Sequence, residues 1–196
     1  MFSVFCPLAT AEGISVSKAE VRLGEDGYHL SVSYDITLSE VMQQALSRGI
    51  SLYFVGEFSL TRPRWYWLDK EVFQGEQTIK LSYNVLTRQY RMSRGALFQN
   101  FSSLEDALQI LARQNSPTIP AALLKKDEGY IAEWTKWIKR EGNYIAAVRL
   151  RLDNAQLPKL LQMNALSGSD WTLNSDWYRW EISPAEMAVK DPARKE

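Results

Sequence analysis

Residues 50–62, ISLYFVGEFSLTR, are the stretch of sequence that decides the fold. Large apolar side chains stand at positions 50, 52, 54, 58 and 60, and most of the positions between them are less apolar. Such alternation is typical of a β-strand that buries one face and exposes the other. Pro63 follows directly, and because proline lacks a backbone N–H, the strand is predicted to end at Arg62.

The segment before this strand predicts a β-hairpin. Apolar residues alternate with polar ones over 14–23 and again over 28–34, and the Glu-Asp-Gly turn at 25–27 joins the two runs. In the first run the apolar face changes near Ser17-Lys18, which predicts a β-bulge at that point. The two strands are therefore expected to pair in antiparallel fashion, with one face toward water.

Two short helices are predicted from capping boxes, in which a Ser or Thr caps the helix and a Glu follows three residues later. Thr37 and Glu40 have this spacing, and Gly49 is expected to end the helix that they begin. Ser102 and Glu105 have it again, before apolar residues that recur at helical spacing.

Alternating apolar residues predict four further strands, over 78–85, 89–93, 144–152 and 178–182. Leu157-Pro158 begins a short turn or helix between the last two of them. The chain is therefore expected to be mainly β. The predicted architecture is an antiparallel two-layer β-sandwich, immunoglobulin-like, with two or three short flanking helices.

The composition of the chain excludes several classes of protein. Its 196 residues hold 23 Lys and Arg against 23 Asp and Glu, so no excess of cationic charge favours a nucleic acid partner. One His and one Cys are too few for a zinc site of Cys and His ligands or for a disulfide, so no metal and no cofactor are expected. No apolar run reaches the roughly 20 residues that span a bilayer.

The N-terminal residues 1–11, MFSVFCPLATA, carry no charge and end in Ala-Thr-Ala, like the apolar region and cleavage site of a secretory signal. No Lys or Arg precedes them, so we interpret this segment as a truncated signal peptide remnant and expect a periplasmic protein. A short apolar cytosolic tail is the alternative. Residues 12–184 are expected to form a single β-sandwich-like domain, followed by a polar disordered tail over 185–196.

Five short motifs, taken in order along the chain, resemble a known family. They are LYFV at 52–55, TRPRWYW at 61–67, LSYN and LTRQYR within 81–91, LPK at 157–159, and DW at 170–171 with SDW at 175–177. Together they resemble the bacterial family described as domain of unknown function 4390. The resemblance covers roughly residues 13–182.

This resemblance implies an exported, envelope-facing protein of Gram-negative bacteria for which no activity is established. Family members are often encoded beside a sensor kinase of the nitrogen-regulation type, which implies a signalling partner. Two features depart from the family pattern, because Leu160 stands where a proline is expected and residues 123–142 look like an insertion. The resemblance supplies no catalytic residues.

A group of arginines and aromatic residues is the strongest candidate for a binding site. If the two segments that hold them adjoin, guanidinium planes can stack on aromatic rings and still donate to a carboxylate or phosphate. Such a patch would suit an anionic glycan, a lipid head group or an acidic partner surface. The alternative is a purely structural cation–π ladder on a sheet face. The candidate residues are Arg62, Arg64, Trp65, Trp67, Arg88, Tyr90 and Arg91.

Residues 123–142 predict an amphipathic helix that ends at Gly142. Its segment 130–141 combines aromatic and cationic residues, as helices that lie on membrane surfaces do, and it could equally fill the groove of a partner. Packing of the apolar stripe on the rest of the domain is the alternative. The candidate contact residues are Trp134, Lys136, Trp137 and Arg140.

Two catalytic arrangements have weaker support in the sequence. His29 shares the polar side of one strand with Asp35, but neighbours on one strand point in parallel and cannot converge as a Ser-His-Asp triad must. Asp170, Asp176 and Glu181 lie near tryptophans and could supply the paired carboxylates of a glycosidase. The two aspartates are equally suited to capping turns.

We therefore expect an exported, periplasmic interaction domain that is not an enzyme. Its expected partner is an unknown envelope protein, for example a sensor kinase, with a membrane surface as a further contact for the 130–141 helix and no nucleic acid. The alternative function is a glycan-binding module or a carbohydrate-active enzyme of the cell envelope.

Overall fold

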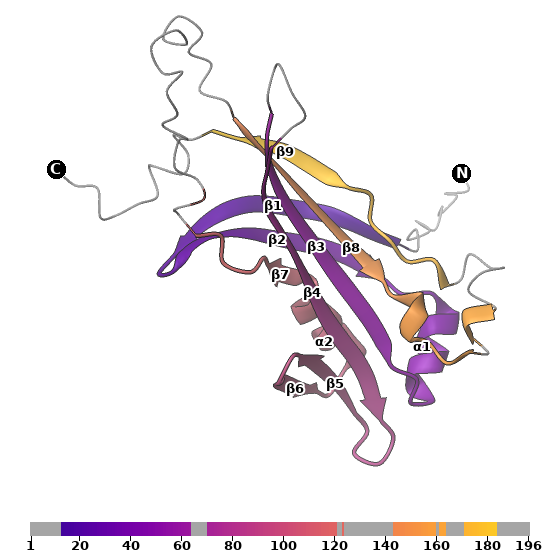
Figure 1. The fold of residues 1–196 in the computed structure, drawn as a ribbon. Helices are drawn as coiled ribbons and strands as arrows, with labels where there is room; N and C mark the ends of the chain where they lie inside the picture. The colour runs from indigo at the N-terminus through magenta and orange to yellow at the C-terminus, as the bar shows by residue number, and fades with distance from the viewer. Residues whose placement is uncertain are drawn as a thin grey trace, which may run out of the picture.

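The computed structural model describes residues 13–63, 70–120, 123, 143–159, 161–163 and 171–183. Within these residues the chain forms two antiparallel β-sheets and three short helices around one hydrophobic core (Figure 1). The prediction of a mainly β chain with two sheets is therefore confirmed.

The larger sheet has six strands in the order β6-β5-β4-β3-β8-β9. Strands β3 to β6 follow one another as a meander, and β8 joins the other edge of β3, so β3 lies at the centre. The predicted immunoglobulin-like topology is not confirmed by this strand order. The strands are β3 (Leu52–Arg62), β4 (Lys70–Asn84), β5 (Gln89–Arg94), β6 (Leu97–Phe101), β8 (Tyr144–Leu152) and β9 (Tyr178–Ile182).

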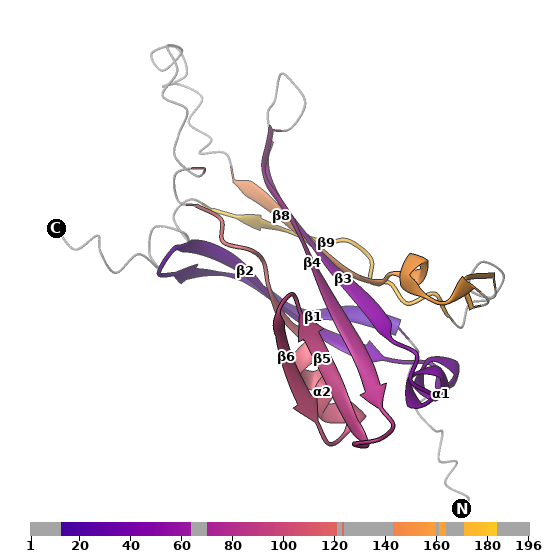
Figure 2. The ribbon, with the colours of Figure 1, turned by 60° about the horizontal axis from the view of Figure 1, so that its bottom comes forward.

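The smaller sheet consists of β1 (Gly13–Gly24), β2 (Gly27–Thr37) and β7 (Arg113–Asn115), in the order β1-β2-β7. Strands β1 and β2 form the predicted hairpin, and its register shifts between Val16 and Lys18, which confirms the predicted bulge. In two views of the ribbon, β1 and β2 run across the strands of the larger sheet (Figure 1, Figure 2).

The helices are α1 (Glu40–Ser47), α2 (Leu104–Leu111) and the 3₁₀ helix η3 (Asn154–Gln156). The predicted caps Thr37 and Ser102 are wrong. Ser39 caps α1 by accepting a hydrogen bond from the backbone N–H of Met42, and Ser103 caps α2 by accepting one from Asp106. The capping serine must stand at the last non-helical residue, and in both cases that residue lies after the predicted one.

Several strands differ from their predicted bounds. β4 begins at Lys70, eight residues before the predicted start at 78, and β6 and β7 were not predicted at all. β8 and β9 occupy the predicted ranges. The predicted helix over 123–142, the tail over 185–196 and the segment 1–11 lie outside the described residues, apart from Leu123.

The core lies between the two sheets and is closed by both α-helices. β2 and β3 contribute side chains that are almost completely buried, and Trp171 fills a further part of the core at 3% exposure. Gln114 of β7 is also buried, and its amide nitrogen donates to the carbonyl of Leu111 at 3.2 Å. Its side-chain oxygen takes the space in front of Gly56 that a Cβ would occupy, so the two sheets meet closely there.

The turn between β1 and β2 also depends on a glycine. Gly27 has a φ of +140°, and the next residue, Tyr28, exchanges two backbone hydrogen bonds with Ile119. A Cβ on Gly27 would lie 2.5 Å from the carbonyl oxygen of Ile119, which is backbone and cannot move aside cheaply. This contact ties the tip of the hairpin to the segment after β7.

We predict that Gly27→Ala lowers the free energy of unfolding by about 2–4 kcal/mol, because it adds backbone strain and a steric clash. Gly13→Ala is the matched control, since Gly13 also has a positive φ but has open space where a Cβ would lie. Urea unfolding of both variants measures the difference. Equal losses in the two variants would show that the contact with Ile119 is not what requires glycine.

Candidate functional site

One face of the six-stranded sheet points away from the core. Side chains alternate between the two faces along each strand. Residues that lie opposite one another on neighbouring strands therefore share a face, and the register identifies those on the outer face. They include Tyr53, Glu57 and Ser59 of β3, Glu76, Lys80 and Ser82 of β4, Arg91 and Ser93 of β5, Phe98 and Asn100 of β6, Arg149 and Arg151 of β8, and Arg179 of β9.

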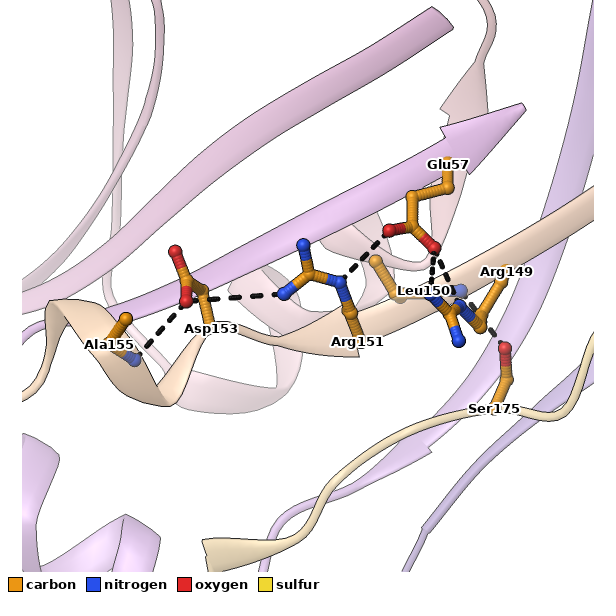
Figure 3. A network of polar contacts seen from close by, with 7 residues as sticks. All are labelled: Glu57, Arg149, Leu150, Arg151, Asp153, Ala155 and Ser175. Carbon is orange, nitrogen blue, oxygen red and sulfur yellow. Dashed lines mark hydrogen bonds and ion pairs between the residues drawn. The ribbon is translucent and has the colours of Figure 1, made fainter. Parts of the chain in front are cut away.

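A cluster of ion pairs lies where β3 and β8 meet on this face (Figure 3). Oε2 of Glu57 accepts from Nε of Arg149 at 2.6 Å, and Oε1 accepts from Nε of Arg151 at 3.0 Å. Asp153 lies 3.9 Å from Arg151 and caps η3 through the N–H of Ala155. One carboxylate thus joins two cations of the neighbouring strand.

The charged groups in this cluster shift one another's pKa values. Burial raises the pKa of Glu57, but the hydrogen bonds from Arg149 and Arg151 outweigh it, so the pKa lies below its usual value. The bond to Glu57 raises the pKa of Arg149 in turn. Since both partners stay charged at neutral pH, the cluster acts as a clamp between β3 and β8.

Trp177 lies beside this clamp, just before β9. The guanidinium carbon of Arg149 is 4.7 Å from the centre of its ring, and that of Arg179 is 5.9 Å from it. Cation–π contacts of this kind stabilise partly exposed aromatic rings. The arginines of β8 and β9 are therefore engaged within the protein.

The other half of the larger sheet carries a different charge pattern. Residues 80–101, which we name the basic hairpin, contain four cations and no Asp or Glu: Lys80, Arg88, Arg91 and Arg94. In the part of the chain that the structure describes, none of the four forms an ion pair with a carboxylate. A chain with no net charge thus concentrates uncompensated positive charge in one region.

A shallow polar hollow lies on the outer face of the basic hairpin. The register sets Lys80 opposite Ser93 and Ser82 opposite Arg91, so two cations and two hydroxyls form a square. Ser51 adds a third hydroxyl, and the hollow has a volume of about 450 Å³. Ammonium, guanidinium and hydroxyl groups are donors to carboxylate or phosphate oxygens, so the chemistry of the hollow suits an anion.

Large apolar side chains are exposed next to these cations. Leu97 and Phe98 of β6 are 77% and 61% exposed, and the guanidinium carbon of Arg91 lies 3.9 Å from the centre of the Phe98 ring. Val85 and Leu86 are exposed in the turn between β4 and β5. Exposed apolar residues that adjoin cations are typical of surfaces that bind a partner.

The structure separates the described residues of the predicted arginine and aromatic group. Arg62 pairs with Lys70 at the start of β4, whereas Arg91 pairs with Ser82 near its end. Twelve steps along a strand correspond to about 40 Å, so Arg62 and Arg91 do not share one patch. The predicted patch requires the segments around Arg62 and Arg91 to adjoin, and for these two residues they do not.

Each described member of that group has its own surroundings. Arg62 donates to the hydroxyl of Tyr144, and its guanidinium carbon lies 4.8 Å from the Tyr144 ring centre. Arg88 is exposed in the β4–β5 turn, and the ring of Tyr90 lies 4.8 Å from that of Tyr83. Arg64, Trp65 and Trp67 lie outside the described residues, as do Trp134, Lys136, Trp137 and Arg140.

The residues weighed for catalysis do not converge in the described part of the chain. Nδ1 of His29 is 3.2 Å from the carbonyl oxygen of Ser116, and Asp176 is exposed in the loop before β9. Glu181 accepts a hydrogen bond from the side chain of Asn143 at 3.0 Å. Asp170 lies outside the described residues.

Neither a metal site nor a membrane-spanning helix is found among the described residues. No group of three or more His, Cys, Asp or Glu side chains in them is arranged to hold a metal ion. No helix among them is both long and apolar enough to cross a membrane.

Sequence reasoning did not single out Lys80, Ser93, Leu97 or Phe98, nor the clamp around Glu57. One pattern could have revealed the basic hairpin, namely the absence of acidic residues over 80–101. The clamp requires the pairing of β3 with β8, which joins residues 92 positions apart and leaves no local pattern.

We predict that Glu57→Gln destabilises the protein at pH 7 by about 1–3 kcal/mol, because two arginines then lose their carboxylate. The folded-state pKa of Glu57 is depressed, so its contribution is present above the unfolded-state pKa and is lost as pH falls through the folded value. Urea unfolding between pH 7 and pH 3 should show the two proteins converging in stability.

Glu71→Gln is the matched control, because Glu71 is an exposed carboxylate on the same neighbouring strand, β4, and lies opposite Thr61 rather than Glu57. It should cost no more than about 0.5 kcal/mol at pH 7. A constant gap between wild type and Glu57→Gln across the pH range would contradict an ionic role for Glu57.

Comparison with known proteins gives one match. No curated protein and no solved structure matches the chain. A family model with the description "Domain of unknown function (DUF4390)" matches residues 11–181, which is most of the chain. The chain therefore belongs to the DUF4390 family.

Proposed function

We propose that this protein is an exported, non-enzymatic interaction domain of the bacterial envelope that binds an acidic surface of a partner protein through its basic hairpin. The observation that carries the proposal is the accumulation of uncompensated cations over residues 80–101 in a chain whose formal charges sum to zero. Binding of an acidic surface would supply the missing negative charge.

The distribution of ion pairs supports this choice of surface. Arg149 and Arg151 share Glu57, and Lys18 and Arg22 share Glu20. In the described residues Lys80 and Arg91 have no such carboxylate, and exposed Phe98 lies under Arg91. Complementary charge speeds association and selects the partner, while exposed aromatic residues supply contact area.

The cellular setting of this proposal rests on the sequence. The uncharged segment 1–11 resembles the apolar region and cleavage site of a secretory signal. We propose that the partner is an envelope signalling protein such as a sensor kinase, to which this domain is accessory. The fold by itself does not select this partner, because similar β folds serve many functions.

The glycan alternative has less support than an acidic protein partner. Sugar rings bind by stacking on open aromatic faces, but two guanidinium groups lie over Trp177. Asp176 and Glu181 belong to a loop and to an edge strand, and Glu57, which lies opposite Glu76, is already bound by Arg149 and Arg151. An anionic glycan in the hollow around Lys80 would be the form of this alternative to test.

We predict that Lys80→Gln/Arg91→Gln weakens binding of an acidic polypeptide by roughly 3–30-fold, because two charge contacts are lost. The probe is fluorescently labelled poly-glutamate, and binding is measured by anisotropy at low and moderate salt. Lys18→Gln/Arg22→Gln removes the same charge from β1 and is the matched control. Equal weakening in both variants would contradict a localised binding surface.

Capture from envelope extracts extends this test to the natural partner. A protein retained by wild type and by the β1 control, but lost from Lys80→Gln/Arg91→Gln, would support the proposal. Melting temperatures of all three proteins must agree within a few degrees. Retention that is lost from Lys80→Gln/Arg91→Gln and is also displaced from the wild type by an anionic oligosaccharide would favour the glycan alternative.

A further inference from the structure

The described structure has four strands at sheet edges, and three of them are protected against pairing with another chain. β1 carries Lys18, Glu20 and Arg22 together with its bulge, and β9 carries Arg179 and Glu181. β7 has only three residues. Charges, bulges and short length are the usual means by which proteins prevent strand addition at an edge.

β6 has none of these protections. Its sequence, Leu-Phe-Gln-Asn-Phe, contains no charged residue and no proline, and its register with β5 is regular from end to end. Strand order places β6 at the end of the larger sheet, so no described strand pairs with its outer edge. Alternate backbone N–H and C=O groups of β6 therefore point outward from the sheet without a strand partner.

Helix α2 leaves this edge accessible. It contacts β5, β6 and β7 and lies against the inner face of the β5–β6 pair (Figure 2). Leu97 has the parity of this inner face but stays 77% exposed, and Phe98 on the outer face stays 61% exposed. An added strand would cover both side chains, one from each face.

The charges beside β6 select an acidic strand. The guanidinium group of Arg91 reaches from β5 over the ring of Phe98, so it lies on β6 at the outer face. Arg94 pairs with Leu97 and points to the inner face, where burial lowers its pKa. Acidic side chains on either face of an added strand would meet a cation that has no carboxylate partner among the described residues.

The same charges disfavour two other occupants. A second copy that paired β6 with β6 would bring two sets of arginines together, and like charges across strands are destabilising. A membrane contact is favoured when the exposed apolar residues gather on one side of the molecule. Leu86 lies at one end of β5 and Leu97 at the other, which corresponds to about 20 Å.

We propose that β6 accepts an extended acidic segment of the partner as a seventh strand, with its side chains covering Leu97 and Phe98. This inference rests on the proposed function, since it names how the basic hairpin binds its acidic partner. Backbone hydrogen bonds to β6 supply affinity, and the arginines of β5 supply specificity for Asp and Glu.

The test uses the full chain and a peptide of about eight alternating Val and Glu residues, the length of an ordinary strand. Hydrogen exchange followed by NMR measures the β6 amides with and without the peptide. Amides at the outer edge are expected to exchange roughly tenfold more slowly at ten times the Kd. A Val–Lys peptide should give no protection, and Arg91→Glu should reverse this preference.

Two proline variants test the backbone contacts. Consecutive residues direct their N–H groups to opposite edges of a strand. Of the two variants Gln99→Pro and Asn100→Pro, one therefore removes an N–H that points outward, and the other removes an N–H that pairs with β5. The variant that keeps the wild-type melting temperature is the informative one. It should lose the peptide's protection of β6 while retaining salt-sensitive binding of poly-glutamate.

The outcomes separate this inference from the proposed function. Binding of the Val–Glu peptide without protection of the β6 amides would overturn strand addition and leave the acidic partner in place. If neither the peptide nor poly-glutamate binds, both proposals fail. Protection of β6 that rises with protein concentration alone, or that requires anionic vesicles, would replace the acidic strand by a second copy or a lipid surface.

Discussion

The double-sided pairing of β3 is the constraint on which the rest of the molecule depends. β4 and β8 occupy its two edges, and Phe54 and Phe58 fill the core beneath it. Because the strand is central, a charged residue on its outer face must find partners close by. Glu57 finds them on β8, so the position of the clamp follows from the position of the strand.

The closeness of the two sheets has a similar origin. Gly56 stands directly before Glu57 on β3 and offers no side chain to the core. The amide of Gln114 fills that space from the opposite sheet, and its nitrogen is held by the end of α2. A single residue without a side chain thus permits a polar group to cross the core.

Sequence patterns predicted the strands that bury one face, and they failed where neither face is buried. β3, β8 and the β1–β2 hairpin have clear alternation because one side of each packs on the core. The first half of β4 is exposed or half-buried at every position, and β6 is exposed at every residue but its last. Such strands are specified by their neighbours, which local periodicity does not record.

The candidate binding surface was predictable only in part, for a related reason. Arg91 was identified from its aromatic neighbours in the chain, but its grouping with Arg62 assumed that segments with similar composition adjoin. The length of β4 separates them. Lys80 was missed because its partners, Ser93 and Arg91, come from the next strand, and a net charge of zero hides a local excess.

The late position of β8 in the chain has a consequence for biosynthesis. Glu57 and Arg149 are 92 residues apart, so the second edge of β3 stays unpaired until that many further residues have been made. At ordinary rates of translation this interval lasts roughly 5–20 s. Meanwhile the meander β3–β6 can form from local contacts, with its most apolar strand exposed at the edge. The nascent chain therefore passes through a stage in which β3, rather than β6, is its most aggregation-prone edge.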